Sequence, residues 1–80
     1  MAAVIRLMRL TREWSQEELG ARAGLKSSEV SLIESGRRNP TLWMLQRLGD
    51  AFGMRCSHMV ELAEDFEANL QRMEQRSTKS

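Results

Sequence analysis

Apolar residues recur every three or four positions along the chain, and polar residues fill the positions between them. This spacing matches the period of an α-helix that buries one face. Strict alternation, which is typical of strands, never lasts more than a few residues, and the strong helix formers Leu, Glu, Arg, Met, Gln and Ala dominate. The sequence therefore predicts an all-α fold.

Capping residues and glycines divide the pattern into helices. Ser15 and Glu18 have the S-x-x-E spacing of a capping box, Gly24 occupies the position of a left-handed C-cap, and Thr41 is a candidate N-cap. We expect five helices, the last of them extended, near residues 3–12, 16–23, 27–35, 42–52 and 58–75. The length of 80 residues fits one domain, which we place at residues 1–76, with a disordered tail at 77–80.

The amino-acid composition excludes several classes of functional site. One cysteine, Cys56, and one histidine, His58, cannot form an internal disulfide or a four-ligand zinc site. The chain has no tyrosine and no glycine-rich phosphate loop followed by Lys-Ser/Thr, and its His and Cys counts allow no plausible catalytic triad. We therefore predict a protein that is not an enzyme and binds no metal or cofactor.

The charge-free stretch at the start, residues 1–5, is too short to span a membrane, so we expect a cytoplasmic protein. Residues 1–12 contain three arginines and no acidic residue, which also fits an amphipathic transit peptide as the second interpretation.

Charge is distributed unevenly along the chain. Residues 1–60 carry nine Lys/Arg against six Asp/Glu, which gives +3, and residues 61–80 carry three against five, which gives −2. Any anionic partner is therefore expected to bind the first part of the chain.

The two short helices near residues 16–23 and 27–35 are joined by a three-residue turn that begins with Gly24, which is the helix-turn-helix arrangement. Spacing alone also fits helical hairpins that never touch DNA. The segments S-Q-E-E-L at residues 15–19 and I-E-S-G-R-R-N-P-T-L at residues 33–42 carry more information. With them, residues 5–62 resemble the lambda repressor/Cro-type helix-turn-helix family, also called the xenobiotic-response-element family.

The resemblance implies that two segments contact DNA phosphates. A helix N-terminus presents unpaired N–H groups and a partial positive charge, which independently favours an anion near Gln16. The phosphate contacts that the family pattern implies are Ser15, Gln16, Arg37, Arg38, Asn39 and Thr41. The plainer alternatives are that Ser15 and Gln16 merely begin a helix and that the basic loop is only solvated.

Base contacts are where this chain departs from the family. Relatives usually carry Gln, Arg, Asn or Lys on the outward face of the third helix, whereas the matching positions here are Ser27, Ser28, Ser31 and Leu32. Serine hydroxyls discriminate bases weakly, and Leu32 can pack against a thymine methyl, so we expect modest direct specificity supplemented by DNA shape. Glu29 could accept a hydrogen bond from cytosine or repel a phosphate. Lys26 lies at the usual cap position, which leaves Ser27 as an alternative N-cap.

Three further positions carry structural expectations. The resemblance implies an internal salt bridge between Arg9 and Glu34. Glu13 stands where relatives often have a glycine, so we expect the turn between the first two helices to be shaped differently. Trp43 is expected to face outward, either as a partner contact or as a lid on neighbouring side chains.

The last predicted helix continues its apolar stripe beyond what one small core can cover. We therefore predict a homodimer formed through the fourth and fifth helices, whose interface residues are Met59, Leu62, Phe66, Leu70 and Met73. The alternative is a last helix that folds back on its own domain. The resulting hypothesis is a sequence-specific transcriptional regulator that binds double-stranded DNA as a dimeric repressor or autoregulator, similar to the controller proteins of restriction–modification systems. The alternative is an antitoxin, in which the same fold binds a toxin or another protein.

Overall fold

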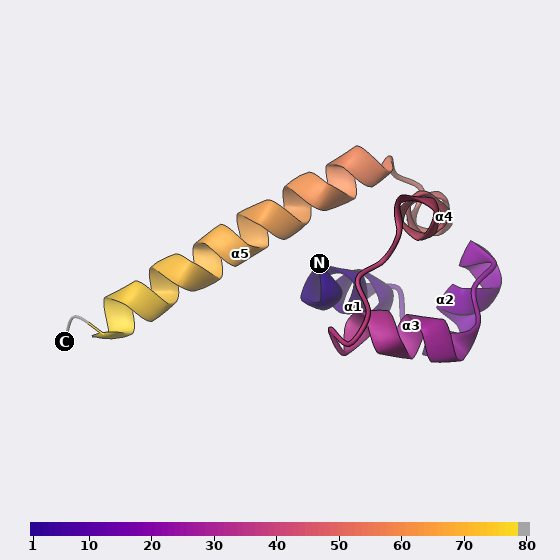
Figure 1. Ribbon diagram of the computed structural model, residues 1–80, viewed down its shortest axis with the longest axis horizontal. Helices are drawn as coiled ribbons and strands as arrows, with labels where there is room; N and C mark the ends of the chain where they lie inside the picture. Colours follow the sequence, from indigo (N-terminus) through magenta and orange to yellow (C-terminus); the bar gives the residue numbers. More distant parts are fainter. Residues whose placement is uncertain (79–80) are drawn as a thin grey trace.

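Five helices make up the protein, and the prediction of an all-α fold is confirmed (Figure 1). The computed structural model describes residues 1–78, with side chains up to residue 74, and all regular structure within that range is helical. The helices are α1 (Ala2–Thr11), α2 (Gln16–Ala23), α3 (Ser27–Glu34), α4 (Leu42–Phe52) and α5 (Cys56–Thr78).

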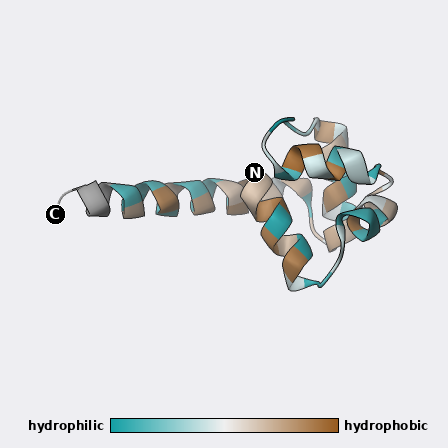
Figure 2. Cartoon of the chain, turned by 90° about the horizontal axis from the view of Figure 1, so that it is seen from below, coloured by the Kyte–Doolittle hydropathy of each residue, from teal (hydrophilic) through white to brown (hydrophobic). Residues whose placement is uncertain are grey.

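Each helix contributes its apolar face to one core. Ile5, Leu19, Ile33, Leu48 and Met59, one from each helix, are at most 1% exposed. On α4, Met44 and Phe52 are also buried, whereas Leu45 is only half-buried. The core lies among α1 to α4 and the first turns of α5, because the remainder of α5 extends past the other helices (Figure 2).

Local hydrogen bonds explain where the helices begin. The hydroxyl of Ser15 accepts from the amide of Glu18 at 3.0 Å, and the hydroxyl of Thr41 accepts from the amide of Met44 at 3.1 Å. Lys26 is the N-cap of α3, so the cap does not pass to Ser27. An ammonium group has no acceptor, and the capping bond here runs from the Lys26 amide to the Glu29 carboxylate at 3.1 Å.

The turn between α2 and α3 requires glycine at two positions. Gly24 has φ +71°, in the left-handed region that favours glycine. The next amide, of Leu25, donates to the carbonyl of Gly20 at 2.8 Å, which folds the turn back onto α2. A Cβ at Gly20 would lie 2.6 Å from the carbonyl oxygen of Leu25, so a side chain there would displace the backbone. The close approach fixes the angle between α2 and α3.

Aromatic and arginine side chains hold the connection between α1 and α2. The rings of Trp14 and Phe52 stack with centroids 5.9 Å apart, and the guanidinium of Arg22 lies 4.3 Å from the Trp14 ring. Arg12 lies over Phe52 at 4.9 Å and donates to the Phe52 carbonyl at 3.1 Å. These contacts attach the end of α1 to α2 and α4.

Helix α5 begins at Cys56, slightly before the predicted start, and runs to Thr78, past the predicted end at Gln75. Its 23 residues correspond to a length of about 34 Å, in a molecule that measures 46 × 22 × 22 Å. The domain boundary at residue 76 stays a prediction, and Lys79 and Ser80 of the predicted tail lie outside the described residues. None of the described helices is long and apolar enough to cross a membrane.

The turn after α1 places Glu13 in the left-handed backbone region that glycine favours. The expectation that this turn is shaped differently from that of relatives stays a prediction. Glu13 has φ +59° and is the one described residue other than glycine with a positive φ. Its side chain is exposed, and no hydrogen bond or ion pair involving it is found among the described residues. An L-residue in this region costs about 1–2 kcal/mol.

We expect Glu13→Gly to stabilise the protein by about 0.5–1 kcal/mol, because relief of the left-handed backbone exceeds the entropy that glycine loses on folding. Thermal unfolding followed by circular dichroism should show a Tm higher by about 2–8 °C. Glu17→Gly, the same change at an exposed position within α2, should lower Tm instead. An equal decrease of Tm in both variants would show that the backbone of Glu13 is not strained.

Candidate nucleic-acid interface

Helix α3 presents one open face, along the lower edge of the molecule in Figure 1. The four predicted base-contact residues share this face and are all exposed, with Leu32 38% exposed: Ser27, Ser28, Ser31 and Leu32. On the opposite side of the helix, Val30 and Ile33 are each 1% exposed. Burial of the second pair orients the helix, because the two sets lie on opposite sides of the 3.6-residue period.

Glu29 is held by contacts within the protein. One carboxylate oxygen accepts from the Lys26 amide, and the other lies 3.9 Å from a guanidinium nitrogen of Arg38. The carboxylate therefore stabilises the start of α3. Its charge is partly offset by Arg38.

The basic loop after α3 is ordered against the end of that helix. The amides of Arg37 and Arg38 both donate to the carbonyl of Leu32, at 3.1 and 3.2 Å. The side chains of Arg37, Arg38 and Asn39 are exposed. Thr41 follows them and uses its hydroxyl to cap α4. The loop thus projects two cations beside the open face of α3.

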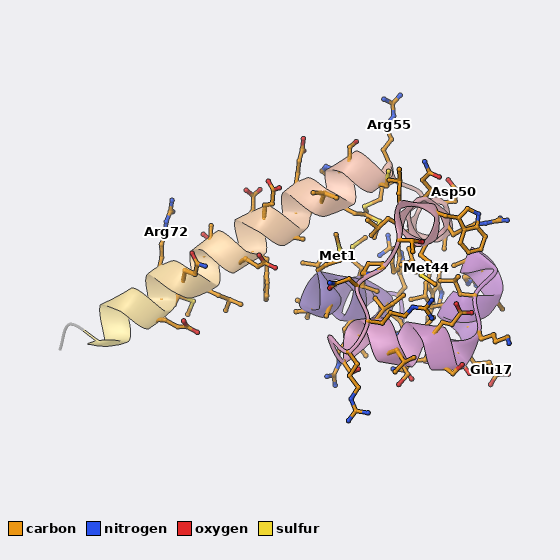
Figure 3. The ribbon with its side chains drawn as sticks, in the orientation of Figure 1. Met1, Glu17, Met44, Asp50, Arg55 and Arg72 are labelled. Atoms are coloured by element: carbon orange, nitrogen blue, oxygen red, sulfur yellow. The ribbon has the colours of Figure 1, made fainter. Side chains whose placement is uncertain are left out.

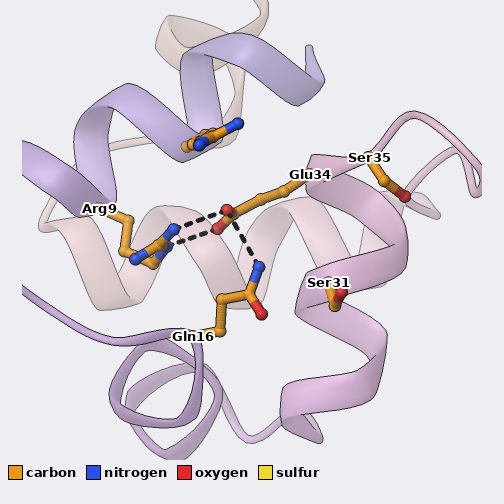
Figure 4. A pocket seen from close by; sticks show the side chains of 6 residues that line it. Arg9, Gln16, Ser31, Glu34 and Ser35 are labelled. Atoms are coloured by element: carbon orange, nitrogen blue, oxygen red, sulfur yellow. Dashed lines mark hydrogen bonds and ion pairs between the residues drawn. The ribbon is translucent and has the colours of Figure 1, made fainter.

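The start of α2 lies on the other side of that face. Ser15 is exposed but its hydroxyl caps the helix, while Gln16 is half-buried. The side-chain amide of Gln16 donates to the carboxylate of Glu34 at 3.4 Å, a long and therefore weak bond. Gln16 is thus oriented toward the end of α3 (Figure 4).

Arg9 and Glu34 form a bidentate ion pair that joins α1 to the end of α3 (Figure 4). The Nε of Arg9 donates to one oxygen of Glu34 at 2.7 Å, and a terminal nitrogen donates to the other at 2.9 Å. The remaining terminal nitrogen donates to the carbonyl of Trp14 at 2.7 Å. The two side chains are 11% and 3% exposed.

The hydrogen bonds that Arg9 donates to Glu34 raise the pKa of Arg9 above its usual value, against the opposing effect of burial. Because the pKa of Arg9 is raised in the folded state, the stability that the ion pair contributes is fully present at any pH below the pKa of an unfolded arginine. It is lost only as the pH rises through the higher pKa of the folded state. Arg9 therefore stays cationic at every ordinary pH.

A polar pocket of about 220 Å³ opens beside this ion pair. Its lining residues come from α1, α2 and the end of α3: Arg6, Arg9, Gln16, Ser31, Glu34 and Ser35. Sequence reasoning missed Arg6, which lies outside the family motifs and one turn before Arg9. Three or more His, Cys, Asp or Glu side chains positioned to hold a metal ion are not found in the described part of the chain.

Two other predicted contact regions differ in exposure. Trp43 is 51% exposed, with the guanidinium of Arg47 5.1 Å from its ring centroid, so it covers a neighbour and still presents a large open surface. Of the predicted dimer residues, Met59 is 0% exposed, which is a correction: the first turn of α5 packs into the core of its own chain. Leu62 and Phe66 are half-buried, and Leu70 and Met73 are 44% and 67% exposed.

Comparison with known proteins is consistent with this geometry. Residues 1–62 match the model of a family described as helix-turn-helix domain. A protein of Sinorhizobium fredii named as an HTH-type transcriptional regulator is 46% identical over 54 residues, which are 65% of this chain and 70% of that protein. A Neisseria meningitidis protein named as a hypothetical transcription factor is 37% identical over 60 residues, which are 75% of this chain and 57% of that protein.

We expect Arg9→Met to destabilise the protein by about 3–5 kcal/mol, because it leaves the charge of Glu34 buried without a partner. A chain of 80 residues has a total stability of about 4–12 kcal/mol, so the variant should lose a large share of its folded population in urea titrations.

Arg55→Met, at an exposed position far from the pair, is the matched control. The double variant Arg9→Met with Glu34→Leu should recover part of the loss, since both charges are then removed. If the Arg9 variant is as stable as the Arg55 variant, the ion pair does not stabilise the fold.

Proposed function

The chain belongs to the helix-turn-helix domain family, and we propose that it is a sequence-specific DNA-binding transcription regulator that acts as a homodimer. The proposal is supported mainly by the open face of α3, which is flanked on one side by the start of α2 and on the other by the basic loop. In this arrangement α3 enters the major groove while its flanks contact the two strands of the backbone.

Phosphate contacts supply most of the affinity in this proposal. Ser15 and Gln16 at the start of α2, and Arg37, Arg38, Asn39 and Thr41 on the other flank, are the proposed phosphate ligands. Of these, Arg37 and Arg38 carry full charges on exposed side chains. Each phosphate that the protein neutralises steepens the dependence of log K on log salt by about 0.9.

Direct base contacts supply a smaller part. Ser27, Ser28 and Ser31 offer short hydroxyls that can donate to or accept from any base, and Leu32 offers an apolar contact to a thymine methyl. None of these makes the bidentate bonds by which Arg, Asn or Gln discriminate bases. We therefore propose that DNA shape contributes to the choice of operator.

Within the family, we propose the lambda repressor/Cro-type subgroup, on the strength of the segments at residues 15–19 and 33–42. We also propose a repressor or autoregulator role, comparable to that of restriction–modification controller proteins. Both relatives carry names of transcription regulators, which supports the regulatory role.

The proposed dimer joins two copies through the distal part of α5. Leu70 and Met73 continue the stripe that begins with the buried Met59, and both are exposed. The distal part of α5 extends past the core of its own chain (Figure 2). Leu62 and Phe66 are half-buried and lie between the two regions. A second copy that packs on this stripe would cover it and would place two α3 helices on one duplex, as a palindromic operator requires.

We expect Leu70→Glu with Met73→Glu to convert the dimer to a monomer, because two carboxylates would be buried on the stripe. Sedimentation measurements should show half the mass of the wild type. Ala68→Glu with Gln71→Glu adds the same charge on the other side of α5 and should leave the dimer intact. A monomeric wild-type protein, or dimers in both variants, would contradict the proposed interface.

Selection of duplexes from random DNA tests the function. At about 50 mM salt the protein should enrich a pseudopalindromic site, and binding should weaken steeply by about 200 mM. Replacement of Arg37 and Arg38 by Gln should reduce the salt slope by about two, equally for selected and random duplexes.

Replacement of Arg55 and Arg72 by Gln removes the same charge away from the proposed surface and should leave the slope unchanged (Figure 3). Failure of the wild type to retain any duplex at low salt would refute the proposed function. Purification with a bound protein partner instead would favour a protein-binding role.

A further inference from the structure

We propose that the pocket between α1, α2 and α3 binds one phosphodiester of the DNA backbone and that Arg6 is its principal ligand. This inference rests on the proposed function and adds a contact that the sequence motifs do not contain. It is supported by the charges, the hydrogen-bonding groups and the volume of the pocket, and by its position beside α3.

The charges of the pocket leave one cation without a partner. Glu34 carries the one negative charge of the lining, and both of its oxygens accept from Arg9. Because that pair is neutral as a unit, the net charge of the lining is that of Arg6. Across the described residues, no acidic group lies within ion-pair distance of Arg6, and no side-chain hydrogen bond restrains it. A singly charged anion would neutralise the pocket.

The hydrogen-bonding groups that remain free are mostly donors. Arg6 offers its guanidinium N–H groups, Gln16 has a second amide hydrogen beside the one directed at Glu34, and the hydroxyl of Ser31 is free to donate. Ser35 is different, because its hydroxyl already donates to the carbonyl of Leu32 at 3.0 Å. A phosphodiester has one negative charge, two non-bridging oxygens that accept, and no donor, so it complements this set.

The volume of the pocket is sufficient for such a group. Its 220 Å³ are many times the roughly 10–15 Å³ that one ordered water molecule needs on the same measure. A phosphate group and a few bridging waters fit in this space. Water-bridged contacts to phosphate are common in protein–DNA interfaces.

The pocket lies beside the residues of α3 that are proposed to contact the bases. Ser31 lines the pocket and also lies on the open face of α3 (Figure 4). A phosphate in the pocket would therefore lie beside the bases that α3 faces, and it would set the depth and register of α3 in the groove. Such a contact positions the protein and carries no sequence information itself.

The test is Arg6→Gln, which removes the charge from an exposed side chain and should leave Tm unchanged. We expect the slope of log K against log salt to fall by about 0.9, with the same fold loss of affinity on selected and random duplexes. Arg55→Gln removes one charge elsewhere and should leave the slope unaltered. An unchanged slope in the Arg6 variant, while the wild type binds DNA normally, would overturn this inference and leave the proposed function standing.

A second measurement separates DNA phosphates from free anions. In an isotope-labelled protein, a short duplex should shift the NMR signals of the Arg6 guanidinium and the Gln16 side-chain amide. Inorganic phosphate or an acidic peptide, at the same concentration of charge, should leave them in place. Shifts with either of these and none with the duplex would overturn the assignment. Failure of the wild type to bind any duplex would instead refute the proposed function.

Discussion

The buried ion pair of Arg9 and Glu34 connects the parts of the protein that have to be arranged around α3. Arg9 reaches from α1 to the last residue of α3 and also bonds the carbonyl of Trp14 in the connection to α2. A buried pair adds little net stability compared with apolar residues, but it permits few geometries. We infer that its main effect is on orientation: the end of α3 is held while its opposite face stays open. It also neutralises Glu34, which would otherwise repel a phosphate in the pocket.

The helix boundaries could be predicted because each depends on a few neighbouring residues. Ser15 and Thr41 cap the helices that follow them, and Gly24 ends the helix that precedes it, as their spacing indicated. The four residues on the open face of α3 came from the resemblance to the family, and the 3.6-residue period accounts for their position on one side of the helix. Such local features need no knowledge of what packs against the helix.

Features that depend on tertiary packing were less predictable. Met59 has the same spacing as Leu70 and Met73, and the sequence does not show where along α5 the core ends, so Met59 was placed in the wrong environment. The backbone of Glu13 is determined by the helices on either side of it rather than by its own preference. The pocket is formed by residues from three helices, and Arg6 belongs to no motif that would have linked it to Gln16 or Ser31.

The composition of the interface makes the dimer necessary for the proposed function. Three serines and a leucine cannot supply the bidentate bonds that give about 1–3 kcal/mol of discrimination each, so one copy would bind many sequences with similar affinity. In a dimer, the base preferences of the two copies multiply, and the distance between the two half-sites becomes fixed. Neither gain requires a further base contact. In the proposed complex, arginines on the flanks would supply affinity that weakens as the salt concentration rises. Selectivity would thus depend on how α5 holds two weakly discriminating α3 helices apart, as well as on the residues that face the bases.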